Sequence, residues 1–222
     1  MNFSVIEPYA PMFWGGLAVT LEVTGAALVL AFALGAVIAV LKVLPCRPLR
    51  LLLDFYTSLF RGIPLIVLLF IVYFATPQLT GYKITMFAAS VLTLGLNGSA
   101  TVSETLRGGI EGVDRGQYDA SHALGLPYVT MMADVIIPQA LRSVAPALVN
   151  EVITVLKSSS LVATIGLMDM MRAAQSVQAL TYRAFEPFVV VAIVYYVIVM
   201  LLTLVANQLE RRLREPQGPR RR

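Results

Sequence analysis

The amino-acid sequence predicts an all-α integral membrane protein. Of its 222 residues, 58% are hydrophobic and 14% are charged, and the mean hydropathy is +0.77. A soluble domain of this length needs many more charges to cover its surface. The apolar residues also form runs long enough to cross about 30 Å of hydrocarbon, which takes about 20 helical residues. The chain is therefore expected to be a bundle of membrane-spanning helices.

Five apolar stretches are expected to cross the membrane. After an N-terminal segment at 1–12, the transmembrane domain is expected to cover 13–209, with a basic tail at 210–222. The five spans are expected at about 13–41, 51–75, 85–106, 141–167 and 188–209. Arg61-Gly62-Ile63-Pro64 predicts a kink or break in the second span, and Pro146 is expected to break the fourth.

The polar region at 107–140 is too charged to cross lipid, and short helices are expected around 117–124 and 128–137. Basic residues predict on which side of the membrane this loop lies. They are frequent at 42–61 and 211–222, whereas residues 1–12 contain neither Lys nor Arg. Because cytoplasmic segments are enriched in Lys and Arg, the C-terminus and the loop are predicted to be cytoplasmic and the N-terminus extracytoplasmic.

Several classes of function are disfavoured by what the chain contains. A single cysteine, Cys46, and a single histidine, His122, argue against a metal centre built from these residues. The net charge of +4 is explained by membrane orientation, so no nucleic-acid partner is expected. The chain has no GxxxxGK[ST] phosphate loop, so any nucleotide hydrolysis must come from another chain.

The polar loop contains a spaced motif. It consists of Asp119-Ala120-Ser121, then Gly125, then Val135, and finally Ile137-Pro138. This pattern resembles the EAA motif of ABC importer permeases: Glu-Ala-Ala, three residues, Gly, nine residues, Ile, one residue, Leu-Pro. Other segments look like the polar amino-acid (histidine- and glutamine-type) branch, among them Phe60-Arg61-Gly62, Pro64-Leu65, Arg107-Gly108-Gly109-Ile110 and Glu186-Pro187-Phe188.

The resemblance implies a type I ABC importer permease fold in a bacterial inner membrane, with a cytoplasmic coupling-helix loop. It implies a second permease subunit (the same chain or a homologue), two cytoplasmic ATPases that bind ATP and Mg, and an extracytoplasmic amino-acid-binding protein. The chain itself would be no enzyme and would need no cofactor. Residues implied in ATPase coupling are Asp119, Ala120, Ser121, His122, Gly125, Leu126 and Pro138.

Polar residues inside the fourth and third spans are the candidate substrate ligands. A charge at the bilayer centre costs about 2.5–3.5 kcal/mol, so it needs a reason. The candidates are Glu151, Asn150, Asn97 and Ser158, which are expected to line an aqueous cavity. An uncompensated Glu151 would favour a cationic amino acid; alternatively, it pairs with Lys157 or with a base on the partner subunit.

Glu104 and Arg107 stand at i,i+3 spacing and are predicted to form a structural ion pair that Arg61 joins. An alternative function is a secondary transporter or channel that works without an ATPase and uses Glu151, Lys157 and Glu104 as a relay. A membrane enzyme is disfavoured because no cluster of catalytic residues falls in a span.

Overall fold

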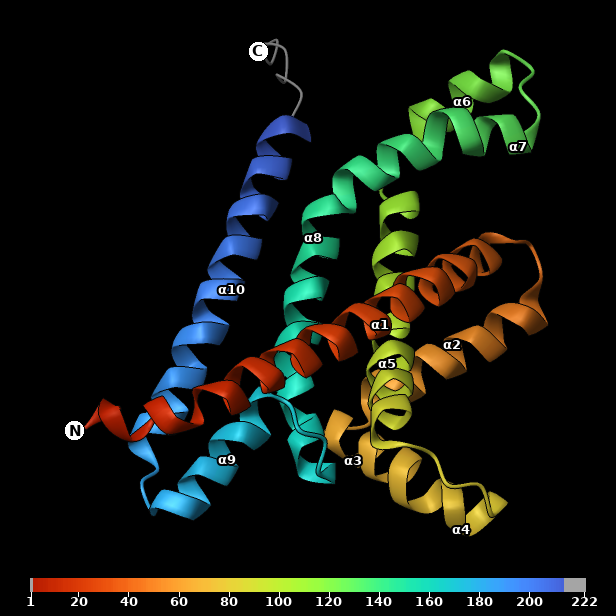
Figure 1. Ribbon diagram of the computed structural model, residues 1–222. Coiled ribbons are helices and arrows are strands. Elements are labelled where there is room, and N and C mark those ends of the chain that lie inside the picture. Colours follow the sequence, from red (N-terminus) through yellow and green to blue (C-terminus); the bar gives the residue numbers. More distant parts are fainter. Residues whose placement is uncertain (1, 214–222) are drawn as a thin grey trace.

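Residues 2–213 are described by a computed structural model in which every element is helical (Figure 1). In chain order the elements are η1 (Phe3–Val5), η2 (Glu7–Tyr9), α1 (Ala10–Val43), α2 (Arg47–Gly62), α3 (Leu65–Phe70), η3 (Ile71–Ala75), α4 (Thr76–Thr80), α5 (Met86–Glu111), α6 (Arg115–Ala123), α7 (Tyr128–Thr130), η4 (Met131–Ile136), α8 (Ile137–Ser158), η5 (Ser159–Ile165), α9 (Met170–Thr181) and α10 (Phe185–Leu213).

Four helical segments in this range are long and apolar enough to span a membrane: 3–43, 86–111, 128–165 and 185–208. A fifth span results if α2 and the helix that follows it are counted together as one broken crossing. The predicted all-α membrane fold is confirmed.

Small residues let α1 and α5 pack closely. A Cβ on Gly35 of α1 would lie 2.7 Å from Val102, and a Cβ on Gly95 of α5 would lie 2.6 Å from Leu30. Both distances are below van der Waals contact, so a larger residue at either position would have to displace its neighbour. This is how helices associate in lipid, where interfaces depend on close packing of small residues. The same region forms an apolar core with α8 and η5, made of Val23, Ala27, Leu94, Val155 and Val162.

The second predicted span is broken at the expected position. α2 ends at Gly62, the chain is extended through Ile63 and Pro64, and α3 begins at Leu65. The helices on either side differ in direction by 102°. Pro64 lacks the backbone N–H that a continuous helix needs, and it disfavours helical backbone at Ile63.

Two helices, α8 and α10, continue further than the sequence-based expectation. The predicted break at Pro146 is wrong, because α8 continues through that residue from Ile137 to Ser158. Proline removes one backbone hydrogen bond, but packing of α8 against α5 and α10 holds the helix together on either side. α10 continues to Leu213, so the expected tail at 210–222 starts as helix, and residues 214–222 lie outside the described range.

The short helix α9 was not predicted from the sequence. Met170, Ala173, Ala174 and Val177 recur along one face of it and pack on α1 and α10 with Phe13 and Val191. Asp169 caps its first turn by accepting a hydrogen bond from the Arg172 backbone N–H at 2.8 Å. The chain enters this helix directly over α1, where a Cβ on Gly16 would lie 2.8 Å from the Asp169 carbonyl oxygen.

This close approach generates a prediction about two neighbouring glycines. Gly16→Ala should lower the free energy of unfolding by about 1–3 kcal/mol, because the new methyl group overlaps backbone atoms that cannot move aside. Gly15→Ala is the matched control, since nothing lies within 4 Å of its Cβ position, and it should be neutral or stabilising by about 0.5–1 kcal/mol. Thermal unfolding in detergent measures both; equal midpoints would contradict the described docking of α9.

Candidate functional site

The polar loop folds as a helical hairpin formed by α6 and α7. Asp114 caps α6 by accepting a hydrogen bond from the Gly116 backbone N–H at 2.7 Å. Gly125 has φ +69°, the left-handed conformation that lets the chain reverse after α6. From Tyr128 the chain is helical again through η4 into α8, and Pro138 lies in the first turn of α8.

A hydrogen bond and apolar contacts hold the hairpin against α5 and the start of α8. The hydroxyl group of Tyr118 donates a hydrogen bond to the carbonyl of Ile110 in α5 at 3.0 Å. Ser121 is buried and donates to the Gln117 carbonyl at 2.7 Å. Beneath the hairpin, Leu126 packs on a cluster formed by Ile110, Met131, Ile136 and Ala140. A force on the hairpin therefore reaches both α5 and α8.

The outer face of the hairpin mixes polar and apolar side chains. Asp119, Ala120 and His122 are exposed, as are Leu124 at 78% and Val129 at 75%. Sequence reasoning did not single out Leu124 and Val129, because apolar residues in a membrane protein are ordinarily assigned to the core or the lipid. Figure 1 shows α6 and α7 at the end of the molecule where α10 ends, opposite α4 and α9.

A buried lysine organises the ion pairs near this end. Lys42 of α1 lies 2.8 Å from Asp54 of α2 and 2.5 Å from Glu104 of α5, and it donates to the Thr57 hydroxyl at 2.8 Å. Its side chain is completely buried. The sequence indicated Lys42 only as an orientation marker, because its partners are far away along the chain.

The predicted pair of Glu104 and Arg107 is present, with 2.7 Å between Oε2 and the guanidinium, and Arg107 also contacts Glu111 at 2.7 Å. Arg61 does not join it: within residues 2–213, Lys42 is the cation that completes the network. Arg61 is exposed and lines a polar hollow of about 430 Å³ together with Glu104. It follows Thr57, the α2 residue that contacts Lys42, by one helical turn.

The candidate substrate ligands on α8 lie along a polar face. Asn150, Thr154 and Lys157 are exposed at spacings of four and three residues, so they share one side of the helix. Glu151 and Ser158 are half-buried at the edge of this face. Thr154 was not identified from the sequence, although its helical spacing from Asn150 could have revealed it.

Glu151 lies against α5. Its Oε1 atom is 3.8 Å from the position of a Cβ on Gly98, and the charge of Arg61 acts on its carboxylate. The neighbouring Asn97 donates its side-chain amide to the Phe60 carbonyl at 2.6 Å. The structure thus brings Glu151, Asn97 and Arg61 into one region, whereas Asn150 precedes Glu151 on the exposed side of α8 and Ser158 lies about two helical turns farther along.

The alternative in which Glu151 pairs with Lys157 does not occur within the part of the chain that the structure describes. Six residues along a helix place two side chains on different faces, so they cannot meet. Among the described residues, Glu151 therefore forms no ion pair.

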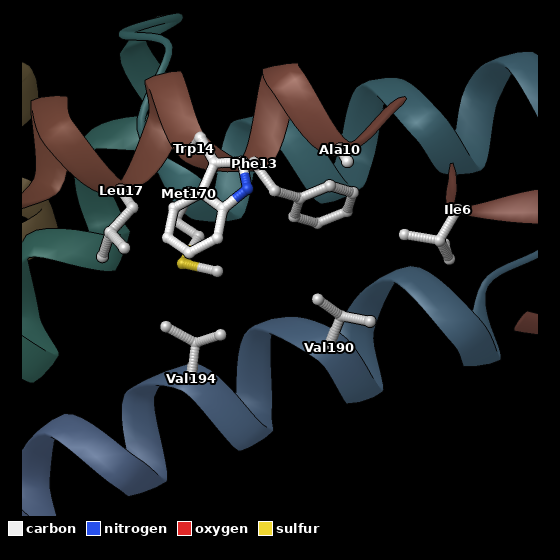
Figure 2. A pocket seen from close by; sticks show the side chains of 8 residues that line it. All are labelled: Ile6, Ala10, Phe13, Trp14, Leu17, Met170, Val190 and Val194. Atoms are coloured by element: carbon white, nitrogen blue, oxygen red, sulfur yellow. The ribbon is translucent and has the colours of Figure 1, made fainter. Parts of the chain in front are cut away.

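A second cavity is unsuited to a polar solute. A groove of about 230 Å³ with almost entirely hydrocarbon walls lies between the first half of α1 and the first half of α10. Figure 2 shows the side chains that line it. Its lining residues are Ile6, Ala10, Phe13, Trp14, Leu17, Met170, Val190 and Val194. A zwitterion in this groove would lose hydration without gaining hydrogen bonds.

Comparisons with known proteins identify the family. Residues 17–215 match the family described as binding-protein-dependent transport system inner membrane component. The arginine transport system permease protein ArtQ of Bacillus subtilis is 44% identical over 214 residues, covering 96% of this chain and 98% of that protein. A putative glutamine transport system permease protein, GlnP of Rickettsia bellii, is 43% identical over 198 residues, covering 89% and 91%.

Solved structures agree with the sequence matches. An amino acid ABC transporter crystallised with histidines has a chain of 38% identity that superimposes with a TM-score of 0.91, covering 96% of this chain and 99% of the other. The MetNI methionine ABC transporter shares the fold, at 21% identity and a TM-score of 0.78, covering 93% and 99%. The resemblance to amino-acid ABC importer permeases is confirmed, and the alternative of a secondary transporter or channel is not supported. The chain belongs to the family of inner membrane components of binding-protein-dependent transport systems, as a multi-pass permease subunit.

Proposed function

We propose that this permease moves a polar amino acid, preferably one with a cationic side chain, into a bacterial cell by alternating access driven by ATP. The observation that carries the substrate class is the half-buried carboxylate of Glu151 beside an exposed polar face in a membrane helix. Exposed Lys157 and Asn150 would be costly against lipid, so this face is suited to water or to a partner. The names of the relatives support an amino acid, and they differ between arginine and glutamine.

The recognition chemistry follows from the three groups that lie together. Glu151 would bind the cationic side chain, Arg61 would attract the substrate's carboxylate, and the free carbonyl oxygen of Asn97 would accept from its ammonium group. Asn150 and Ser158 lie on or beside the same face and would line the approach to the site.

The partners follow from what this chain leaves open. A second permease subunit, either another copy or a homologue, would enclose the polar face of α8, and the exposed apolar residues Leu51, Leu52, Phe55 and Leu59 of α2 offer it a contact surface. Two cytoplasmic ATPases would supply the sites for ATP and Mg, since this chain carries no phosphate loop. A binding protein would deliver the amino acid from the other side.

The α6–α7 hairpin would dock on an ATPase through Asp119, Ala120, His122 and Leu124. The mixed polar and apolar character of this exposed face is suited to a protein contact. With this assignment the C-terminus would lie in the cytoplasm and the N-terminus outside. Two observations support this orientation: the hairpin and the end of α10 share one end of the molecule (Figure 1), and basic residues favour the cytoplasm.

The coupling role predicts the effect of a charge on the hairpin. Ala120→Arg should reduce amino-acid uptake about tenfold or more in proteoliposomes, equivalent to a loss of roughly 1.4 kcal/mol in coupling, while the membrane protein stays folded. Gln208→Arg, an exposed position on α10 at the same end, is the control and should leave uptake unchanged. Normal ATP-driven uptake by the Ala120 variant would argue strongly against docking through this face.

The role of Glu151 in selectivity predicts a change in preference. Glu151→Gln should weaken stimulation by arginine relative to glutamine about 10- to 100-fold, because a hydrogen bond to a charged group is worth about 1.5–3 kcal/mol. The measurement is substrate-stimulated ATP hydrolysis by the assembled transporter. Glu22→Gln, an exposed carboxylate on α1, is the matched control. Unchanged selectivity would remove Glu151 from the specificity site.

A further inference from the structure

A second group of polar side chains is buried where α1, η5, α9 and α10 meet. Thr20 of α1 fastens this junction: its hydroxyl donates to the Gly16 carbonyl at 2.9 Å and accepts from the Met170 backbone N–H at 3.1 Å. Thr20, Ser159 and Asp169 are all fully or almost fully buried. None of these residues belongs to the proposed substrate site.

Hydrogen-bonding groups in this junction lack partners. Only one carboxylate oxygen of Asp169 is used, Oδ1, which accepts from the Arg172 backbone N–H. Within residues 2–213, the buried side-chain polar atoms without a hydrogen-bond partner are Asp169 Oδ2, the Tyr195 hydroxyl and Thr24 Oγ1. Buried polar atoms nearly always have a hydrogen-bond partner, so unpaired ones indicate a place where a proton or a ligand can bind.

Two of the unpaired groups, Asp169 and the Tyr195 hydroxyl, are close to each other. The Tyr195 hydroxyl lies near the hydroxyls of Ser159 and Thr20, without hydrogen-bond geometry, and near enough to Asp169 to interact electrostatically. Thr24 stands one helical turn after Thr20 on the buried face of α1. Each of these neighbours is a hydroxyl group, which can either donate or accept.

No cation in the described part of the chain forms an ion pair with the Asp169 carboxylate, although the charge of Arg172 acts on it. The Tyr195 hydroxyl of α10 interacts electrostatically with it and lies near Ser159 of η5 and Thr20 of α1, and Thr20 accepts a hydrogen bond from the backbone N–H of Met170, the residue after Asp169. On α9, Arg172 is exposed, and its guanidinium lies 3.4 Å from the Gln175 side-chain oxygen. An isolated buried carboxylate is costly, and it normally avoids this cost by binding a proton.

We propose that Asp169 is a proton-binding site that fastens α9 to the bundle. In the protonated form, Oδ2–H donates a hydrogen bond to one neighbouring hydroxyl group, such as that of Tyr195, with the proton taken up from the solution. Loss of that proton leaves a buried anion among hydroxyls and weakens the contact of α9 with α1. Met170 packs beside this site in the apolar groove of Figure 2, where it adjoins Phe13 and Trp14 and limits access of water.

Electrostatics give the direction and range of the effect. Burial raises the pKa of the Asp169 carboxyl from 3.8 to about 6, more than the backbone N–H of Arg172 lowers it. Because the pKa is higher in the docked state, docking of α9 is strongest below about pH 4 and weakens as the pH rises through about 6. A difference of about two pKa units corresponds to about a 100-fold change in the docking equilibrium.

The test compares two aspartates that both cap helices. Asp169 is buried, whereas Asp114 caps α6 and is exposed, so Asp114→Asn is the matched control for Asp169→Asn. Asparagine retains the capping oxygen but cannot titrate. The purified wild-type protein in lipid should show an infrared carbonyl band of a protonated buried carboxyl that appears as the pH falls through about 6, and its unfolding midpoint should rise over the same range.

Asp169→Asn should abolish both signals, and Asp114→Asn should leave both in place. Tyr195→Phe removes one hydroxyl partner and should move the infrared transition to lower pH, which tests the site without altering the acid. Retention of the band and of the pH-dependent midpoint in Asp169→Asn would overturn the proposal. If that variant does not fold, an unshifted transition in Tyr195→Phe would overturn it. None of these readouts depends on transport.

Discussion

The ammonium group of Lys42 is the constraint on which the arrangement of the first three long helices depends. A buried charge costs several kcal/mol unless it is paired and hydrogen-bonded, and Lys42 meets this requirement only when α2 brings Asp54 and Thr57 to it and α5 brings Glu104. Moving α2 or α5 would take away one of the two carboxylates that pair with this buried ammonium group. The network therefore selects a single register of α1, α2 and α5.

This register explains how the hairpin can act on a distant site. α5 leads into the hairpin and α8 leads out of it, and these two helices carry Gly98 and Glu151, which lie against each other. Residues 98–111 of α5 extend over about 20 Å at 1.5 Å per residue. A displacement of the hairpin therefore moves both sides of the Glu151 region together. In the proposed function, opening and closing must then take place against the second permease subunit, as a rigid-body motion.

The sequence was informative wherever a local pattern determined the structure. Apolar runs predicted the spans, and the Gly62 to Pro64 segment predicted the break after α2, since both depend on residues adjacent in the chain. Local sequence patterns did not predict the features of the structure that depend on tertiary packing. Lys42 meets Glu104 across 62 residues, which no local pattern reveals, and packing keeps α8 helical through Pro146. The helix α9 was missed because its apolar face is short and partly built from alanine.

Three membrane-associated carboxyl groups illustrate how environment, rather than residue type, determines a role. Glu104 contacts two cations, so it is committed to holding helices together. Asp169 is buried near the Tyr195 hydroxyl and forms no ion pair with any residue that the structure describes, so in our proposal it binds a proton. Glu151 is half-buried at the edge of an exposed polar face and feels the charge of Arg61 without forming an ion pair. It is thus the carboxylate of the three that a cation arriving from outside can both reach and neutralise.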